Sequence, residues 1–278
     1  MFHVEHFSMF YLRNTNLYFT FFTVAKIIAI ANQKGGVGKT TTAVNLAASL
    51  AVAEKRTLLI DMDSQANATS GLGITSFNKT LYHVLLGDAS IKDVVLNTEL
   101  EFLKIIPSDQ DLVGIEIELV SVIGRENKLK EALELIDGEY EYIFIDCPPS
   151  LGILTINALV ASDSFLVPMQ CEYYAMEGLS KLLNTVQLIR KSLNPGLKQE
   201  GILLTMYDRR NKLSHQVADE VRKHFKVGVF DVVIPRNIRL SESPSHGKPA
   251  LLYDVGSKGA LSYLNLAEEL MKKEETLI

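Results

Sequence analysis

Short apolar runs alternate with longer stretches of helical spacing from Lys26 onward. Apolar runs of four to eight residues bounded by turn signals are typical of buried strands. The runs predict strands at 27–31, 57–60, 102–106, 142–145, 165–167, 202–205 and 232–234. The helical stretches predict helices at 40–53, 111–122, 128–136, 154–161, 178–192, 214–225 and 259–272.

Strands that are apolar on both faces and alternate with helices predict a parallel sheet covered on both sides. The expected fold class is therefore α/β, with a mostly parallel sheet between two layers of helices. In such sheets ligands bind at the carboxyl ends of the strands. Candidate chemistry is best sought in the residues that directly follow each predicted strand.

Residues 1–25 do not follow this pattern, because they are rich in Phe and Tyr. We expect this N-terminal extension to be disordered or to result from a start codon assigned too early. Its apolar stretch at 17–25 is too short to span a bilayer.

The composition is that of a soluble globular protein, with 47% hydrophobic residues, 22% charged residues and a formal net charge of −5. Two cysteines are too few for a disulfide scaffold or for a four-cysteine zinc site. Two reduced thiols suit a cytosolic protein, so we expect a cytoplasmic location.

The strongest chemical signal is a glycine-rich turn between the first strand and the first helix, which consists of Lys34, Gly35, Gly36, Val37, Gly38, Lys39, Thr40 and Thr41. Glycines let backbone N–H groups surround phosphate oxygens, and the helix N-terminus adds a positive dipole end. Lys39 is placed to neutralise the β- and γ-phosphates, and the Thr40 hydroxyl to reach Mg²⁺. The usual P-loop has glycine where this chain has Gln33, and this loop carries a second lysine, Lys34. Since Lys34 does not easily serve the same phosphates from the same side, it is a candidate for acting on a neighbouring subunit.

Three further segments occur in order after this loop, at residues 59–67, 145–149 and 234–248. Together the segments resemble the deviant Walker A, A′ and B motifs of the ParA/MinD ATPases, and the last run is similar to the chromosomal ParA subgroup called Soj. The resemblance covers residues 26 to about 270, so we expect 26–278 to form a single ParA-type P-loop ATPase domain. The chain departs from the family at Ser64, where proline is usual.

The resemblance implies an ATP-dependent homodimer in which the nucleotides lie between the subunits. Lys34 would contact the phosphates of the opposite subunit, and Gly35 would allow the close approach. ATP and Mg²⁺ are the expected cofactors, because phosphoryl transfer needs positioning, a metal and charge neutralisation.

Each remaining site residue has an expected role. Thr40 is expected to ligate Mg²⁺, Asp146 to hold a metal-bound water and Asp61 to support the metal. Asp63 is expected to position the attacking water. Pro235 and Asn237 match family positions that contact adenine.

Local charge is compatible with DNA binding, and the alternative explanation is that these charges lie on solvated helix faces. Residues 201–250 carry nine basic and five acidic side chains, a net charge of +4, which leaves −9 on the rest of the chain. A basic face on an acidic body suits phosphate contacts without base reading. Arg239 matches a residue implicated in nonspecific DNA binding in the Soj-like group. The expected DNA contacts are Arg209, Lys212, Arg236, Arg239 and Lys248.

The resemblance favours an ATPase of chromosome or plasmid partitioning, in which ParB bound at parS stimulates hydrolysis and release from nucleoid DNA. One alternative is a nucleotide-gated regulator of a replication or transcription initiator, which is also a possible partner. Another is a MinD-like positioning ATPase, but the acidic C-terminal run 268–278 does not suit a membrane-binding helix. We therefore expect no membrane partner.

Overall fold

The computed structural model describes residues 24–172, 175–225 and 228–275. Seven strands form one sheet in the order β3-β4-β2-β5-β1-β6-β7. Every neighbouring pair is parallel except β3 with β4. The strands are β1 (Lys26–Ile30), β2 (Thr57–Asp61), β3 (Leu96–Asn97), β4 (Leu103–Ile106), β5 (Tyr142–Asp146), β6 (Ser164–Gln170) and β7 (Lys198–Thr205). The predicted α/β fold class is confirmed.

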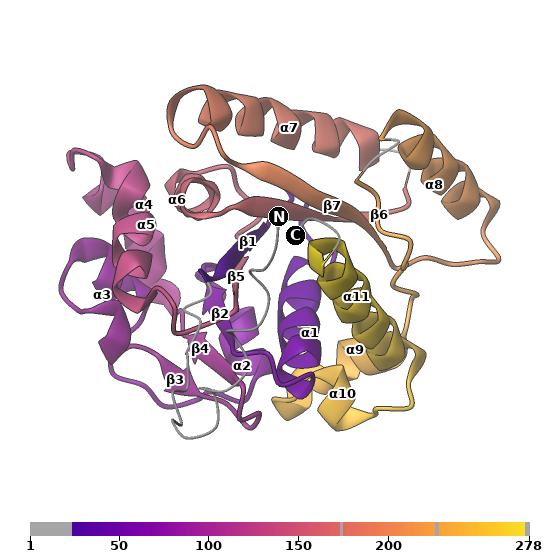
Figure 1. Cartoon of the computed structure of the whole chain (residues 1–278), viewed down its shortest axis with the longest axis horizontal. Coiled ribbons are helices and arrows are strands. Elements are labelled where there is room, and N and C mark those ends of the chain that lie inside the picture. The colour runs from indigo at the N-terminus through magenta and orange to yellow at the C-terminus, as the bar shows by residue number, and fades with distance from the viewer. Residues whose placement is uncertain (1–23, 173–174, 226–227, 276–278) are drawn as a thin grey trace, which may run out of the picture.

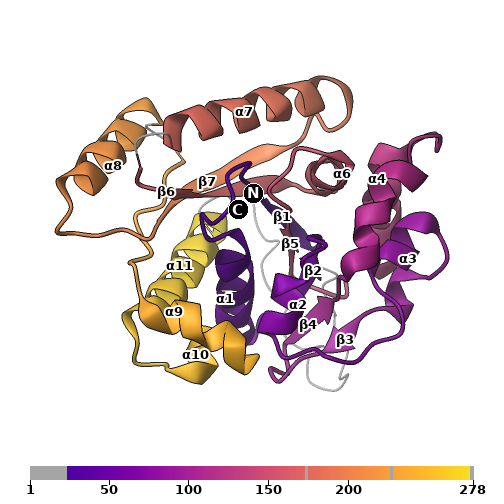
Figure 2. The same ribbon diagram turned by 180° about the vertical axis from the view of Figure 1, so that it is seen from behind.

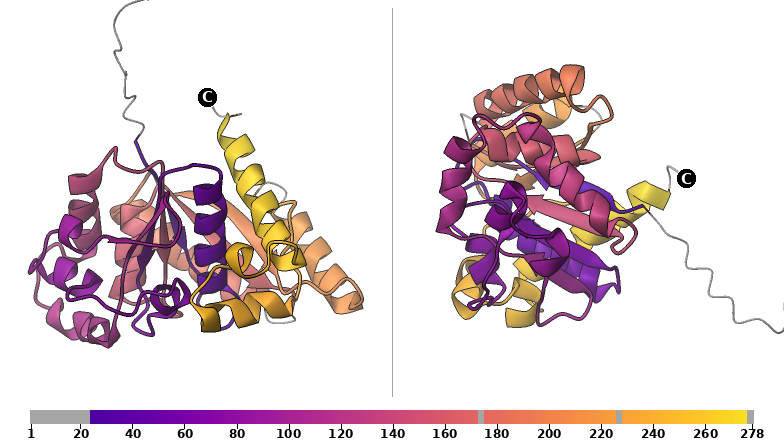
Figure 3. Two further views of the ribbon diagram at one scale, coloured as in Figure 1. Left: turned by 90° about the horizontal axis from the view of Figure 1, so that it is seen from below. Right: turned by 90° about the vertical axis from the view of Figure 1, so that its left-hand side faces the viewer.

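Helices cover both faces of the sheet (Figures 1 and 2). One face carries α3 (Leu81–Leu86), α4 (Ile115–Glu118), α5 (Lys128–Leu133), α6 (Ile153–Ala161), α7 (Ala175–Ser192) and α8 (Lys212–His224). The other face carries α1 (Lys39–Val52), α2 (Asn67–Gly71), α9 (Ile238–Glu242), α10 (Ala250–Tyr253) and α11 (Lys258–Glu275). Figure 3 shows α1 and α11 side by side. Five 3₁₀ turns occur in the described ranges, at Ile91–Asp93, Gln110–Gly114, Arg125–Asn127, Glu134–Ile136 and Ser243–His246.

The alternation of side chains along the central strands explains the two apolar layers. In β5, Ile143 and Ile145 enter the layer under α3–α8, whereas Tyr142 and Phe144 enter the layer under α1 and α11. Successive residues of a strand point to opposite faces, so a strand buried on both faces must be apolar throughout. The sheet is held from both sides, and its carboxyl edge is fixed in place.

The structure corrects the strand predicted at 232–234. This segment runs beside the end of β7, where the Ile234 N–H donates to the Leu204 carbonyl (2.9 Å). The isolated bridges to β7 and just beyond it are made by the flanking residues Val229 and Pro235. Asp231 and Val232 direct their N–H groups to the Glu269 carboxylate instead (3.0 Å each). Pro235 has no N–H to continue a ladder.

Several other boundaries differ from the prediction. The helix expected at 111–122 is a 3₁₀ turn, Gln110–Gly114, followed by the single turn of α4. The hydrophobic pattern did not predict five short elements, because each is too short to show a clear hydrophobic period. They are the strand β3 and the helices α2, α3, α9 and α10.

The expectation for the N-terminal extension, residues 1–25, falls almost wholly outside the described residues. Among the helices in the described ranges, none combines the length and the apolar character needed to cross a membrane.

Candidate active site

The loop between β1 and α1 contains the backbone conformations that a phosphate-binding turn needs. Gly36 and Gly38 have positive φ angles of 71° and 89°, a region that side chains with a Cβ rarely adopt. Helix α1 begins at Lys39, directly after Gly38. The Thr205 hydroxyl donates to the Val37 carbonyl (2.8 Å), which fixes the loop to the end of β7.

The two lysines of the loop have different surroundings. Lys39 is 7% exposed, and its ammonium lies 3.4 Å from the Lys34 carbonyl, inside the turn. Burial lowers the pKa of Lys39, and the charges of Asp146 and Asp63 oppose the shift. Lys34 instead reaches out of the turn to an ion pair with Glu172.

Gly35 has no steric reason to be glycine within this chain. A Cβ placed on Gly35 would have no atom within 4 Å, and its φ is not among the positive values. The residue is exposed beside the half-buried Lys34.

Asp61 lies at the carboxyl end of β2 and is completely buried. Thr69 donates both its N–H (2.8 Å) and its hydroxyl (2.7 Å) to one carboxylate oxygen of Asp61. The other oxygen accepts the Asp63 N–H (3.2 Å). Burial raises the pKa of Asp61 to about 6, and these hydrogen bonds oppose the shift.

Asp146 lies beside Asp61, because the two residues are paired in the register of β2 and β5. Both carboxylate oxygens of Asp146 are buried, and neither has a hydrogen bond of acceptable geometry. Burial and the charge of Asp61 raise its pKa well above the usual range, and Thr40 and Lys39 oppose the shift. A buried carboxylate without partners fits a divalent cation, and Mg²⁺ prefers carboxylate, hydroxyl and phosphate oxygens. Within the described ranges no three His, Cys, Asp or Glu side chains converge as a complete metal site.

Asp63 follows β2 by two residues and is 9% exposed. One of its carboxylate oxygens accepts the Gln65 N–H (3.0 Å). Its backbone carbonyl accepts the Ser108 hydroxyl (2.8 Å), and the Ser108 N–H donates to the Thr69 hydroxyl (3.0 Å). The loop after β2 is therefore joined both to α2 and to the end of β4.

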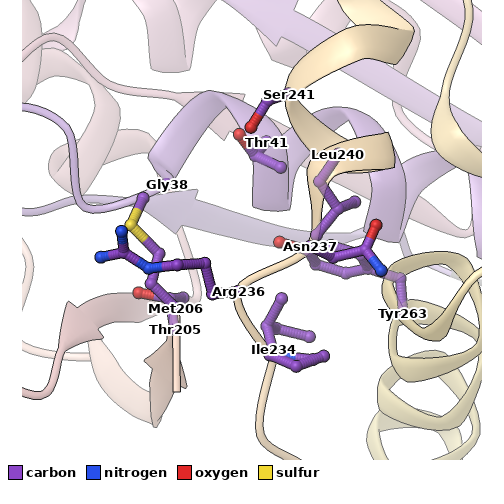
Figure 4. Close-up of a pocket in the computed structure, with 11 residues that line it drawn as sticks. Gly38, Thr41, Thr205, Met206, Ile234, Arg236, Asn237, Leu240, Ser241 and Tyr263 are labelled. Atoms are coloured by element: carbon purple, nitrogen blue, oxygen red, sulfur yellow. The ribbon is translucent and has the colours of Figure 1, made fainter. Parts of the chain in front are cut away.

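A pocket of about 160 Å³ lies beside the glycine-rich loop (Figure 4). One wall consists of Gly38 and Thr41, and another of Thr205 and Met206 at the end of β7. The remaining wall comes from the segment 234–241 together with Tyr263 of α11. The Tyr263 hydroxyl lies 3.1 Å from that of Thr42, so α1 and α11 are linked behind the pocket.

Pro235 and Asn237 both line this pocket, next to the phosphate-binding loop. They follow an extended segment rather than a regular strand. The Asn237 side-chain oxygen accepts the Arg239 N–H (2.9 Å) and caps α9, so part of its hydrogen-bonding capacity is used within the chain.

The five expected DNA contacts lie on separate elements. Arg209 and Lys212 are exposed at the start of α8, and Arg236 is exposed at the pocket. Arg239 pairs with Glu242 (2.8 Å) and Asp254 (3.1 Å), and Lys248 pairs with Glu99 (3.1 Å). Exposed ion pairs contribute about 0–1 kcal/mol, so these pairs present little barrier to exchange with phosphates.

Sequence reasoning missed the residues that hold the site together from outside the motifs. Thr69 and Ser108 connect the two aspartates after β2, Glu172 receives Lys34, and Met206 lines the pocket with a φ of 49°. Ser108 and Met206 do follow strand ends, which was the available signal. Thr69 and Glu172 carry no such signal.

The glycine-rich loop with its two lysines, the aspartates at neighbouring strand ends and the doubly covered parallel sheet define a P-loop ATPase of the ParA/MinD class. A family profile described as an AAA domain matches residues 25–199. "Chromosome partitioning protein ParA" of Myxococcus xanthus is 59% identical over 254 residues, which cover 91% of this chain and 90% of that protein. "Sporulation initiation inhibitor protein Soj" of Bacillus subtilis is 59% identical over 89% of this chain and 98% of that protein.

A solved structure has a similar fold. "Cobyrinic Acid a,c-diamide synthase" of Mycobacterium smegmatis, with a bound ATP analogue and magnesium, is 36% identical. It has a TM-score of 0.81 and covers 92% of this chain and 98% of that chain. The chain belongs to the ParA/Soj family of chromosome-partitioning ATPases, as the resemblance implied.

Proposed function

We propose that this partitioning ATPase forms an ATP-dependent dimer that binds duplex DNA without sequence preference. Contact with a ParB-type protein at parS then triggers hydrolysis and release. The observation that carries the proposal is the pair of lysines in one glycine-rich loop. Lys39 is buried inside the turn, whereas Lys34 points out of it beside the open space at Gly35. A second subunit can approach at Gly35 and receive Lys34 on its phosphates.

ATP and Mg²⁺ are the cofactors, in agreement with the ligands of the similar mycobacterial structure. The backbone N–H groups of the loop and Lys39 bind the phosphates, and the pocket of Pro235 and Asn237 takes the adenine. Thr40 and Asp146 hold Mg²⁺, which neutralises charge on the transferring phosphoryl group. Asp61 is held by Thr69 and supports this arrangement from the neighbouring strand end.

Asp63 positions the attacking water. Its carboxylate lies on the loop after β2, where a hydrogen bond from the Gln65 N–H orients it. Its backbone carbonyl accepts a hydrogen bond from the Ser108 hydroxyl, which holds the loop in place. The oxygen of the attacking water forms a bond to the γ-phosphorus in line with the ADP oxygen, the bond to the ADP oxygen breaks, and a proton of the water is released together with ADP and phosphate. A Lys34 ammonium from the opposite subunit adds positive charge where negative charge develops.

DNA binding rests on cations of the basic 201–250 region, of which Arg209, Lys212, Arg236 and Arg239 are exposed and Lys248 is half-buried. Dimerisation doubles the number of phosphate contacts, so a weak monomer site becomes a useful dimer site. ATP acts as the switch for DNA through dimerisation. The protein thus acts in the cytoplasm on the nucleoid, with residues 26–278 as one ATPase domain.

The test combines dimerisation and turnover. With ATP and Mg²⁺ we expect the molar mass by light scattering to double, and hydrolysis to rise when DNA and ParB with parS are both present. Lys39→Ala should abolish nucleotide binding, whereas Lys34→Ala should keep binding and lose dimerisation. A Lys34→Ala protein that still dimerises with ATP would overturn the proposal.

The name of the Bacillus relative favours a second candidate, a nucleotide-gated regulator of an initiator protein. Asp63→Ala separates the two, because it removes the group that positions water while leaving the nucleotide in place. If the protein is a regulator, Asp63→Ala holds it in its ATP form and it stays active. If it is a partitioning ATPase, Asp63→Ala prevents its release from DNA and chromosome segregation stalls. Regulation without a segregation defect in Asp63→Ala cells would favour the second candidate.

A further inference from the structure

An apolar stripe lies on the segment between β4 and α5. Val113, Ile117, Val120 and Ile123 are 63%, 78%, 63% and 98% exposed. All four belong to one continuous segment, which runs through the 3₁₀ turn Gln110–Gly114, the single turn of α4 and the turns that follow it. We call these four side chains the 113–123 stripe.

The stripe is fixed in place by the opposite side of the same segment. Leu112, Ile115 and Leu119 are buried in the layer under α3–α8. The segment is therefore packed onto the sheet and presents a second apolar side to solvent. Single exposed apolar residues are common, but a contiguous group with polar borders is typical of an interaction site.

The borders of the stripe are acidic. Five carboxylates lie between residues 109 and 126, against one basic side chain, Arg125. The Arg125 guanidinium is occupied by Glu126 (3.2 Å) and by the Val120 carbonyl (2.8 Å). Nucleic acids and anionic lipid surfaces are repelled by this charge, whereas a basic protein segment is attracted.

The stripe also lies next to the catalytic strand ends. Glu116 of α4 approaches the loop after β5, and a Cβ on Gly152 would lie 2.1 Å from its carboxylate oxygen. Gly152 precedes α6 and is six residues beyond Asp146. The ribbon views place β2 and α1 between α4 and α5 on one side and α9 and α10, which carry or adjoin Arg239 and Lys248, on the other (Figures 1 and 2). A protein on the stripe therefore leaves those DNA contacts uncovered.

We propose that the 113–123 stripe is the docking surface for a basic, amphipathic helix of the partner that stimulates hydrolysis. The apolar side of that helix covers Val113, Ile117 and Val120, and its basic residues pair with the acidic border. When the partner displaces α4, Glu116 shifts the 147–152 loop, and the loop in turn shifts Asp146. This inference rests on the proposed function, in which a ParB-type protein is the stimulating partner.

The surface is tested first with peptides of defined chemistry. The probes are two fluorescent 18-residue amphipathic helices, one of Leu and Lys and one of Leu and Glu. The Leu–Lys peptide should bind the full-length protein and the Leu–Glu peptide should not. The double variant Ile117→Ser/Val120→Ser should weaken Leu–Lys binding by at least about tenfold, since two apolar anchors are lost. Equal binding to this variant would overturn the surface.

The control double variant is Val52→Ser/Leu188→Ser, which removes two side chains of similar exposure, 51% and 66%, from α1 and α7. It should bind the Leu–Lys peptide like the wild type. Equal weakening by the control would show nonspecific apolar binding and would also overturn the proposal.

The partner is tested with ParB and parS DNA in the hydrolysis assay. In Ile117→Ser/Val120→Ser the ParB concentration for half-maximal stimulation should rise about tenfold or more, with unstimulated hydrolysis and ATP-dependent dimerisation unchanged. If ParB stimulates this double variant as it does the wild type, the proposed docking site is wrong. If the double variant no longer dimerises with ATP, the stripe contacts a second copy of the chain, and the proposal is also wrong. Absence of ParB stimulation in the wild type, with selective peptide binding retained, would remove the ParB step of the proposed function and leave the surface standing.

Discussion

The hydroxyl of Thr69 connects two groups that the sequence motifs do not connect. It donates to Asp61 at the end of β2 and accepts the Ser108 N–H at the end of β4. Thr69 is 2% exposed, so neither bond has water as a substitute. A buried carboxylate that loses a donor retains its desolvation cost, so Thr69 matters more than its place outside the motifs suggests.

Replacement of Thr69 tests this role. Thr69→Val keeps the shape and removes the hydroxyl, so we expect the free energy of unfolding in urea to fall by about 1–3 kcal/mol. Thr69→Ser keeps the hydroxyl and should lose less stability than Thr69→Val. A Thr69→Val variant as stable as Thr69→Ser would show that the hydroxyl does not contribute to the free energy of unfolding.

The sequence predicted the motif side chains of the candidate site better than the residues that hold these side chains in place. Lys39 and the aspartates 61, 63 and 146 occur in motifs of fixed spacing, and the structure gathers them at the carboxyl edge of the sheet. Ser108 and Glu172 contact the site across 45 and 138 residues of sequence. Only the packed fold brings them there, so no local pattern marks them.

Two glycines bring α2 against the segment that carries Lys248. A Cβ on Gly247 would lie 2.6 Å from the Gly73 Cα, and both residues have positive φ angles of 62° and 74°. Gly71 adjoins Pro244 in the same contact. This contact ties the loop of Asp63 and Thr69 to the segment that follows α9.

Gly247→Ala tests this contact, with Gly124→Ala as the control. Gly124 has a similar φ of 72°, but a Cβ there would have no atom within 4 Å. The control therefore measures backbone strain alone, about 1 kcal/mol. Gly247→Ala should lower the free energy of unfolding further, because the new methyl group meets backbone. Equal losses in thermal or urea unfolding would show that the two segments separate freely.

The ion pair between Lys34 and Glu172 leads to a prediction about dimerisation. Their side chains are 39% and 45% exposed, so the pair is worth about 0–1 kcal/mol. Because Lys34 must leave Glu172 to reach a second subunit, Glu172→Gln should tighten ATP-dependent dimerisation by up to about fivefold in sedimentation velocity. Glu177→Gln, which breaks the exposed pair with Lys181, is the control. Weaker dimerisation in Glu172→Gln would show that Glu172 helps Lys34 rather than holds it back.

At the scale of elements, long apolar and periodic stretches were predictable, and short ones were not. Six predicted strands are present in the described structure, because a strand buried on both faces has a distinct composition. The segment 232–234 has that composition, but the Glu269 carboxylate accepts the N–H groups of Asp231, just before the segment, and of Val232, its first residue. Tertiary contacts of this kind override local preference.

The whole molecule separates its charges. The basic 201–250 region contributes the exposed cations near α8, α9 and the pocket, while the 113–123 stripe and its acidic border lie at the far end (Figure 1). The nucleotide site lies between them, at the carboxyl edge of the sheet. In the proposed function, DNA and the stimulating partner would therefore bind to separate parts of the molecule.

One titration tests whether the nucleotide controls binding to DNA. A fluorescent random-sequence duplex is titrated with the protein and Mg²⁺, with ATP or with ADP, at about 50 mM and about 200 mM salt. We expect binding with ATP only, weakened by at least about tenfold at the higher salt concentration, and weakened again by Arg239→Ala. Equal binding with ADP, or no binding with either nucleotide, would contradict the proposed function.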